Sequence, residues 1–119
     1  MSLADNRALA YRVYEAINQQ DVATLDELFD ANIIRHAAGE VGIEKAREAL
    51  QKAFAGNTIK RFVVEDVLVD GDKAALRVHV HDTIDESVPP LFIIMEIFRI
   101  ENGRIMEIWG AGTKRQPSN

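Results

Sequence analysis

The chain has 119 residues, the usual size of one domain, and 47% of them are apolar, which is enough to fill a single core. A net charge of −5 without any strongly basic stretch argues against nucleic acid as a partner, and the lack of cysteine excludes disulfides and cysteine-based zinc sites. No apolar run approaches the ~20 residues that a membrane span needs, and no signal peptide is recognisable at the start. We expect one cytoplasmic domain over residues 1–119, with a flexible tail from about residue 114.

The first half of the chain predicts three helices and one short strand. Apolar residues recur at helical spacing from about Ala4 to Gln19. Asp21 can cap a second, short helix, and the stretch IEKAREALQKAF at 43–54 predicts a third. The stretch NIIRHA at 32–37, between the second and third helices, predicts the strand.

The second half predicts four strands joined by short turns. IKRFVVEDVLV at 59–69 ends at an Asp-Gly-Asp turn, and KAALRVHVHDTI at 73–84 follows it. LFIIMEIFRI at 91–100 leads into an Asn-Gly pair, a strong hairpin signal, before IMEIWGAG at 105–112. Helices followed by an antiparallel meander indicate an α+β fold.

The strand at 91–100 is apolar on both of its faces. One face carries Phe92, Ile94, Phe98 and Ile100, and the other carries Ile93, Met95 and Ile97. Three short helices can cover only one side of the sheet, whereas an antiparallel sheet usually leaves its other side polar. We therefore expect a second copy of the chain to cover the remaining side, in a homodimer.

Three stretches resemble the SnoaL-like proteins of the nuclear transport factor 2-like superfamily, also called cystatin-like: AINQQDVATLDELFDANIIRH, VEDVLVDGDKAALRVHVH and MEIFRIENGRIMEIW. The resemblance implies a cone-shaped, curved antiparallel sheet wrapped around the N-terminal helices. It also implies an apolar pocket at the open end of the cone and a dimer through the outer face of the sheet. The superfamily includes ketosteroid isomerases, polyketide cyclases, dehydratases and non-catalytic binders, so the fold alone leaves the function open.

His36 and Glu96 are the candidate catalytic residues. The resemblance places His36 at the end of the first strand, facing the pocket, where a histidine can exchange a proton near neutral pH. Glu96 is a carboxyl group inside an apolar decapeptide, and it aligns with the oxyanion-hole acid of ketosteroid isomerases. Burial would keep Glu96 neutral, while an ion pair with Arg77 or a histidine is the alternative.

Arg77, His79 and His81 share one face of their strand, because residues two apart point to the same side. The pattern alone makes this face the solvent side and the Leu76, Val78 and Val80 face the core. The resemblance implies the reverse, with the polar residues in the pocket and the apolar ones under a dimer partner, and this is the interpretation that we adopt.

A metal site at His79 and His81 is an alternative interpretation of their spacing. Two histidines two apart can offer two ligands, and Glu86 lies near the spacing of the cupin metal motif. Cupins, however, are all-β proteins with fixed glycines and a later histidine that this chain lacks. We expect no metal.

Five further residues are expected to contact a ligand. They are Tyr14 on the first helix, Phe54 on the third, and Phe98, Ile108 and Gly110 on the last two strands. The role of Tyr14 is open, since the ketosteroid isomerase tyrosine aligns one residue away and core packing would also explain it. Gly110 stands where the SnoaL-like pattern has an acid, which counts against polyketide cyclase activity.

Two functions remain open from the sequence. The first is a cofactor-free isomerase, lyase or cyclase that moves a proton next to a carbonyl in a small hydrophobic substrate, with His36 as base and Glu96 as neutral acid. The second is a ligand-binding or interaction module of the same fold without chemistry. The lost acid at Gly110 favours the second function, and a histidine and an acid in one cavity would favour the first.

Overall fold

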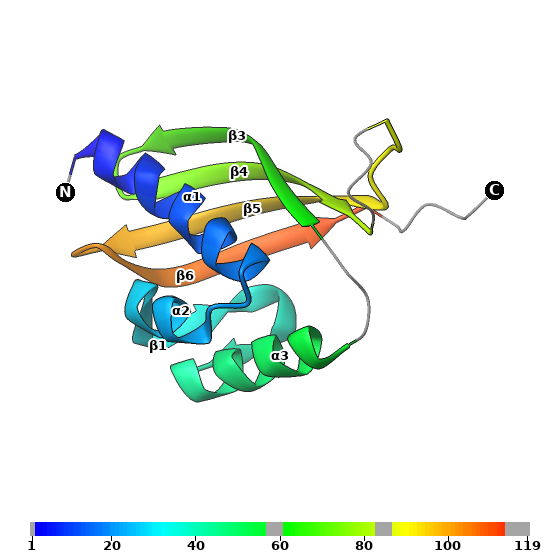
Figure 1. The fold of residues 1–119 in the computed structure, drawn as a ribbon. Helices are drawn as coiled ribbons and strands as arrows, with labels where there is room; N and C mark the ends of the chain where they lie inside the picture. The colour runs from blue at the N-terminus through cyan, green and yellow to red at the C-terminus, as the bar shows by residue number, and fades with distance from the viewer. Residues whose placement is uncertain (1, 57–60, 83–86, 114–119) are drawn as a thin grey trace.

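Figure 1 shows the computed structural model of the chain, which describes residues 2–56, 61–82 and 87–113. Its helices are α1 (Leu3–Asn18), α2 (Val22–Leu28), the short 3-10 helix η1 (His36–Ala38) and α3 (Ile43–Ala55). Its strands are β1 (Phe29–Arg35), β2 (Glu40–Val41), β3 (Arg61–Asp70), β4 (Lys73–His81), β5 (Phe92–Glu101) and β6 (Arg104–Gly112). The predicted α+β fold is confirmed. The predicted flexible tail, from about residue 114, lies outside the described residues.

The strands form one curved, unclosed sheet in the order β2-β1-β6-β5-β4-β3. The last four strands pair antiparallel, as the meander predicts. Strand β1 lies parallel to β6, which the sequence did not predict. The α1 helix lies across one face of the sheet, and α2 and α3 flank β1 on the same side (Figure 1). The face under the helices is called the inner face below, and the opposite face the outer face.

The α1 helix is fixed at its start and along one side. Ser2 and Asp5 form a reciprocal capping box, which satisfies backbone N–H groups that a helix start leaves free. The amide of Asn6 donates a hydrogen bond to the carbonyl oxygen of Gly71 in the β3–β4 turn, at 3.1 Å. The helix is thereby held against the sheet, and its buried side, which includes Leu9 and Val13, faces the strands.

The apolar face of β4 belongs to the core and not to a dimer interface. Leu76, Val78 and Val80 are all buried within the chain itself. They point to the inner face because α1 packs there, and Leu76 is paired with Glu96 across the β4–β5 ladder. The expectation taken from the resemblance is therefore wrong for these three residues, and the pattern of alternating side chains alone is right.

The outer face of the sheet nevertheless exposes a set of apolar side chains. Met95 on β5 is 54% exposed and Leu68 on β3 is 72% exposed, and Ile97 lies on the same face of β5 as Met95. Together with Trp109 they line a shallow depression of about 720 Å³. Exposed apolar patches of this kind are typical of interfaces, so the homodimer stays a prediction, now through these residues.

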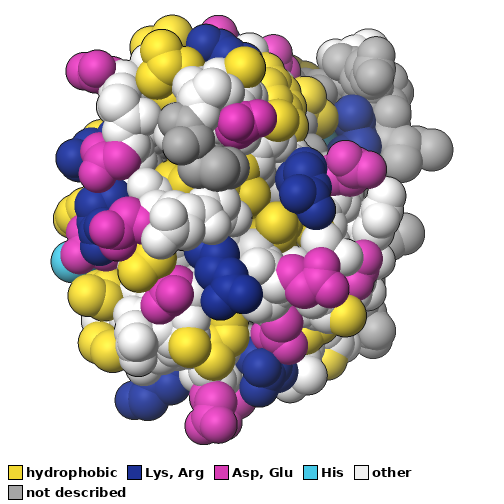
Figure 2. Space-filling view, turned by 90° about the vertical axis from the view of Figure 1, so that its left-hand side faces the viewer, with side chains coloured by type: hydrophobic (Ala, Val, Ile, Leu, Met, Phe, Trp, Pro, Cys, Tyr) yellow, Lys and Arg dark blue, Asp and Glu magenta, His cyan; other side chains and the backbone are white. Residues whose placement is uncertain are grey.

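The surface at the left of Figure 1 carries both signs of charge. In Figure 2, acidic and basic side chains alternate on this face with apolar ones, and no single-sign field dominates it. Such a surface offers no basic track for a nucleic acid backbone. Among the described residues, no helix combines the length and apolar character needed to cross a membrane.

The dimer prediction is tested by placing a charge in the outer apolar set. Met95→Glu should convert a dimer into a monomer in sedimentation velocity at micromolar concentration, because the carboxylate would be desolvated at the interface. Val41→Glu is the matched control, since Val41 is also an exposed apolar side chain but lies on β2. An unsubstituted protein that sediments as a monomer would contradict the prediction.

Candidate functional site

An inner cavity of about 290 Å³ lies between α1, α3 and the inner face of the sheet. Ligand pockets span about 300–1,000 Å³, so this cavity suits a small molecule. Its described lining consists of Val13, Tyr14, Ile17, Asn18, Gln20, Phe29, Arg35, Leu50, Ala53, Phe54, Phe62, Ile94, Glu96, Phe98 and Ile108. Most of these side chains are apolar, and three bear an ionisable group: Tyr14, Arg35 and Glu96.

Glu96 reaches the cavity through the alternation of side chains along β5. Ile94 and Phe98, two residues away on either side, line the same cavity. Met95 and Ile97 point instead to the outer face. The sequence predicted this orientation for Glu96, and the structure places the carboxyl group there.

Gly110 makes room for the Glu96 side chain. The two residues are directly paired across β5 and β6. A Cβ atom at Gly110 would lie 3.2 Å from Cγ and 3.5 Å from Oε2 of Glu96, which is tighter than ordinary packing for the first contact. The acid that the SnoaL-like pattern places at this position would therefore compete with Glu96 for the same space. The cavity has its carboxyl group on β5, opposite the position where the family pattern has one.

Tyr14 is the hydrogen-bond partner of Glu96. The Tyr14 hydroxyl donates to Oε1 of Glu96 from the α1 helix, and Tyr14 is only 5% exposed. Its ring packs against Phe62, with ring centroids 5.8 Å apart. Within the described part of the chain, no other hydrogen bond to the Glu96 carboxyl is found, so Oε2 has no protein partner there. Tyr14 thus has a polar role in addition to core packing.

Burial dominates the electrostatics of this pair. Desolvation raises the pKa of Glu96 above its ordinary 4.5, and the Tyr14 hydrogen bond and the positive charge of Arg35 offset part of that rise. Burial also raises the pKa of Tyr14 well above 10.0, and the negative charge of Glu96 and the hydrogen bond to it act in the same direction. The proton between them therefore stays on the tyrosine, and Glu96 is the member of the pair that titrates.

Arg35 brings a permanent positive charge to the cavity. It pairs with Ile108 across the parallel β1–β6 ladder, and Ile108 lines the cavity too. Its Nη1 atom donates to Oε2 of Glu40 on β2 at 2.8 Å. The alternation of side chains along β1 could have predicted that Arg35 faces inward. Ile33 and Arg35 share one face of the strand, and Ile33 is a core residue. The sequence analysis missed Arg35 because it assigned the inner face to His36.

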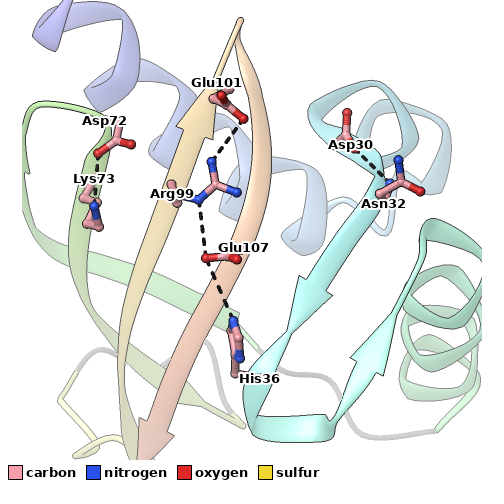
Figure 3. A network of polar contacts seen from close by, with 8 residues as sticks. All are labelled: Asp30, Asn32, His36, Asp72, Lys73, Arg99, Glu101 and Glu107. Atoms are coloured by element: carbon pink, nitrogen blue, oxygen red, sulfur yellow. Dashed lines mark hydrogen bonds and ion pairs between the residues drawn. The ribbon is translucent and has the colours of Figure 1, made fainter.

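His36 lies outside the cavity, and the prediction that it faces the pocket is wrong. The same alternation that turns Arg35 inward turns the next residue outward. His36 is exposed in η1 and stacks on the Trp109 ring, with centroids 4.8 Å apart and 4° between the planes. Its Nε2 atom is 4.0 Å from Glu107, which also accepts a hydrogen bond from Arg99 (Figure 3). The predicted pair of His36 and Glu96 across one cavity is not present.

The predicted ligand contacts of Arg77, His79 and His81 are also wrong for this cavity. All three lie on the outer face or at its edge, because the apolar residues between them fill the inner face. Arg77 donates to Asp66 at 2.6 Å and lies 2.9 Å from Nε2 of His79. His81 is buried near the end of the strand, where it lines a separate depression with His79.

No metal site is formed by the part of the chain that the structure describes. There, histidine, aspartate and glutamate side chains form no group of three placed to hold a metal ion. Glu86, the third ligand of the weak cupin-like alternative, lies outside the described residues.

The remaining predicted ligand contacts fall in two groups. Tyr14, Phe54, Phe98 and Ile108 line the inner cavity, whereas Gly110 lies beneath Glu96. Besides Arg35, the sequence analysis missed apolar lining residues from four elements, which include Val13, Phe29, Leu50 and Phe62. Their apolar character predicted burial, and nothing in the pattern separated a cavity wall from the core.

In this chain the sheet curves around the helices and forms an apolar cavity with few polar groups. These are the features of the cone-shaped pocket proteins of the nuclear transport factor 2-like superfamily. Within that class, the sequence model of the SnoaL-like domain matches residues 10–108. The chain belongs to the SnoaL-like domain family. None of the curated protein sequences is similar enough to match it.

Solved structures with the same fold come from several bacteria. TsrD from Streptomyces laurentii is 23% identical over 94% of this chain and 90% of its own, with a TM-score of 0.76. A SnoaL-like polyketide cyclase from Agrobacterium tumefaciens is 20% identical over 96% and 94%, with a TM-score of 0.77. A protein provisionally described as a ketosteroid isomerase, from Kribbella flavida, is 16% identical over 98% and 84%, with a TM-score of 0.78. At these identities the likeness shows the fold.

The raised pKa of Glu96 predicts a pH-dependent contribution to stability. The folded chain holds this proton more tightly than the unfolded chain, so the unfolding free energy falls as pH rises from about 4.5 through the folded-state pKa. Glu96→Gln should remove this fall. Urea denaturation of both proteins between pH 4 and 9 should therefore show the variant gaining stability relative to the parent within this window, by at most about 1.4 kcal/mol per pH unit. A stability difference that stays constant with pH would contradict the assignment.

Proposed function

We propose that the inner cavity binds a small, largely apolar carbonyl compound and that Glu96 moves a proton next to the carbonyl, without a cofactor. This is chemistry of the isomerase and cyclase type. The observation that carries the proposal is the buried hydrogen bond between Tyr14 and Glu96 in an otherwise apolar cavity. Burying a carboxyl group is costly, and this one is placed where a ligand can meet it.

The geometry supports Glu96 as the proton-transfer group. Proton transfer is most efficient when the pKa of the group lies near the working pH, and burial raises the pKa of Glu96 in that direction. Tyr14 occupies Oε1 and holds the carboxyl group in one orientation, which leaves Oε2 as the acceptor. The sequence suggested His36 as the base and Glu96 as the acid. Because His36 lies outside the cavity, we assign both roles to Glu96.

Arg35 supports the same reaction from β1. When Glu96 takes a proton from the carbon beside the carbonyl, negative charge develops on the carbonyl oxygen. A fixed positive charge in a largely apolar cavity stabilises such an oxyanion more than it stabilises the neutral ketone. Where the enolate is conjugated with a C=C bond, return of the proton from Glu96 to the far carbon completes an isomerisation. Where the substrate has a second carbonyl, attack of the enolate carbon on it closes a ring, and Glu96 gives the proton to the resulting alkoxide.

The family and its neighbours support this class of function. The chain is a SnoaL-like domain, and structures of the same fold include a SnoaL-like polyketide cyclase and a protein provisionally described as a ketosteroid isomerase. The cavity volume, near the lower limit for ligand pockets, favours a ligand of one or two rings over a larger one.

A second candidate function is ligand binding without chemistry. Two observations favour it: His36 lies outside the cavity, and Gly110 stands in place of the family's acid. In that case protonated Glu96, held in place by Tyr14, would donate a hydrogen bond from Oε2 to the oxygen of a bound ketone and would keep its proton.

Proton exchange into a ketone separates the two functions. In D2O, 2-tetralone exchanges its α-hydrogens, and ¹H NMR follows the loss of signal. The protein should accelerate this exchange, and Glu96→Gln should reduce the acceleration by at least ~100-fold, because the amide cannot accept the proton. Glu96→Ala should in addition weaken binding, since it leaves the Tyr14 hydroxyl without its partner.

Glu107→Gln is the matched control, because it makes the same change on the outer face, beside His36. It should leave the exchange rate unaltered. Binding of 2-tetralone without acceleration by the parent protein would overturn the enzyme and leave the binding function. Full activity in Glu96→Gln would show that Glu96 acts only as a hydrogen-bond donor.

A further inference from the structure

A neutral ketone in its ground state does not require the full positive charge of Arg35, so Arg35 can recognise an anionic group on the ligand in addition to its role in the reaction. Among the described residues that line the inner cavity, Arg35 is the only one with a positive charge. The chain as a whole carries a net charge of −5, so its surface gives anions no general attraction. An anion that binds in this cavity would therefore depend on Arg35.

One nitrogen of the Arg35 guanidinium group donates a hydrogen bond to the protein, and its other nitrogens have no such bond among the described residues. Glu40 accepts a hydrogen bond from Nη1 at 2.8 Å, and the Arg35 side chain is 30% exposed. A guanidinium group has five N–H donors in a planar fork. In residues 2–56, 61–82 and 87–113, no further hydrogen bond from Arg35 is found. The unused donors match the two oxygens of a carboxylate, which arginine binds in a bidentate manner.

Glu40 positions Arg35 without neutralising the site fully. The two residues are direct partners in the β1–β2 ladder, so the ion pair is set by backbone register. It is partly exposed, and such pairs contribute little to stability, roughly 0–1 kcal/mol. The ion pair therefore anchors one nitrogen of Arg35, and the other nitrogens carry the N–H donors that a bound anion would use.

Other parts of the cavity wall are apolar. Leu50, Ala53 and Phe54 come from α3, and Phe62 comes from β3. These side chains suit a ring system and offer no hydrogen bond. A ligand that fits both the apolar wall and Arg35 therefore combines a ring with one anionic group, in addition to the carbonyl beside Glu96.

We infer that the ligand class of this cavity is a small cyclic or aromatic keto acid, whose carboxylate binds Arg35. The inference rests on the proposed function for the cavity itself and narrows its substrate. In this arrangement the carboxylate pairs with the unused donors of Arg35, the ring lies against α3, and the reacting carbon faces Glu96.

A pair of matched probes tests the charge requirement directly. 2-Naphthoate and 2-naphthamide have nearly the same shape and differ in charge. Isothermal titration calorimetry at pH 7 should give at least a ~10-fold lower Kd for 2-naphthoate, since hydrogen bonds to charged groups are about twice as strong as neutral ones. Arg35→Gln should abolish this preference and leave the affinity for 2-naphthamide within about 2-fold.

Two further variants separate charge from folding. Glu40→Gln removes the competing carboxylate and should increase the preference for 2-naphthoate. Arg35→Lys keeps the charge and should retain part of the preference, which covers the case in which Arg35→Gln does not fold. Arg99→Gln, which removes an arginine from the outer-face ion pairs with Glu101 and Glu107, should change nothing.

Equal affinity for the two probes, binding of neither probe, or an undiminished preference in a folded Arg35→Gln protein would overturn the inference. These outcomes are distinct from failure of the proposed function, which is read from proton exchange into 2-tetralone. A protein that exchanges protons but ignores charge keeps its proposed function and loses this ligand class. A protein that prefers 2-naphthoate but exchanges no protons keeps the ligand class as a binding module.

Discussion

The hydrogen bond between Tyr14 and Glu96 is the interaction on which the inner cavity depends. It joins the N-terminal helix to the centre of β5 and satisfies a carboxyl group among apolar side chains. A single hydrogen bond of this kind is worth roughly 0.5–1.5 kcal/mol, while an unsatisfied buried group costs more. The pair therefore adds little net stability to the fold, and buried ionisable groups with a shifted pKa are frequent at functional sites.

Three features of the chain position the two partners of this hydrogen bond. The capping box of Ser2 and Asp5 fixes the start of α1, and the bond from Asn6 to the β3–β4 turn fixes its position on the sheet. Gly110 removes the side chain that would otherwise occupy the space of Glu96. A Cβ atom at this position of β6 would press against the side chain of Glu96, so the glycine favours the present position of the acid on β5.

Much of the fold could be predicted from the sequence, because it follows from local periodicity. The three helices and the four-stranded meander each come from spacing within one segment. The inward orientation of Glu96 was predicted from the resemblance, because the strand is apolar on both faces. The site was predicted less well, because its makeup depends on which side of β1 and β4 faces the helices. On β1 the wrong face was assigned to the cavity, so His36 was predicted as the site residue in place of Arg35. On β4, the pattern of Leu76, Val78 and Val80 was correct, and the resemblance misled. The Tyr14 contact depends on the rotation of α1 over the sheet, which no local pattern determines.

The most direct test of the role given to Glu96 is the titration of its carboxyl group by ¹³C NMR, with the Glu96→Gln spectrum used to assign the resonance. We predict a midpoint above the ordinary 4.5, because burial is the largest influence on the pKa of this group. In Tyr14→Phe the midpoint should be higher still, because the tyrosine hydrogen bond favours the charged form. A midpoint at or below 4.5 that does not respond to Tyr14→Phe would contradict the assignment of Glu96 as the proton-transfer group.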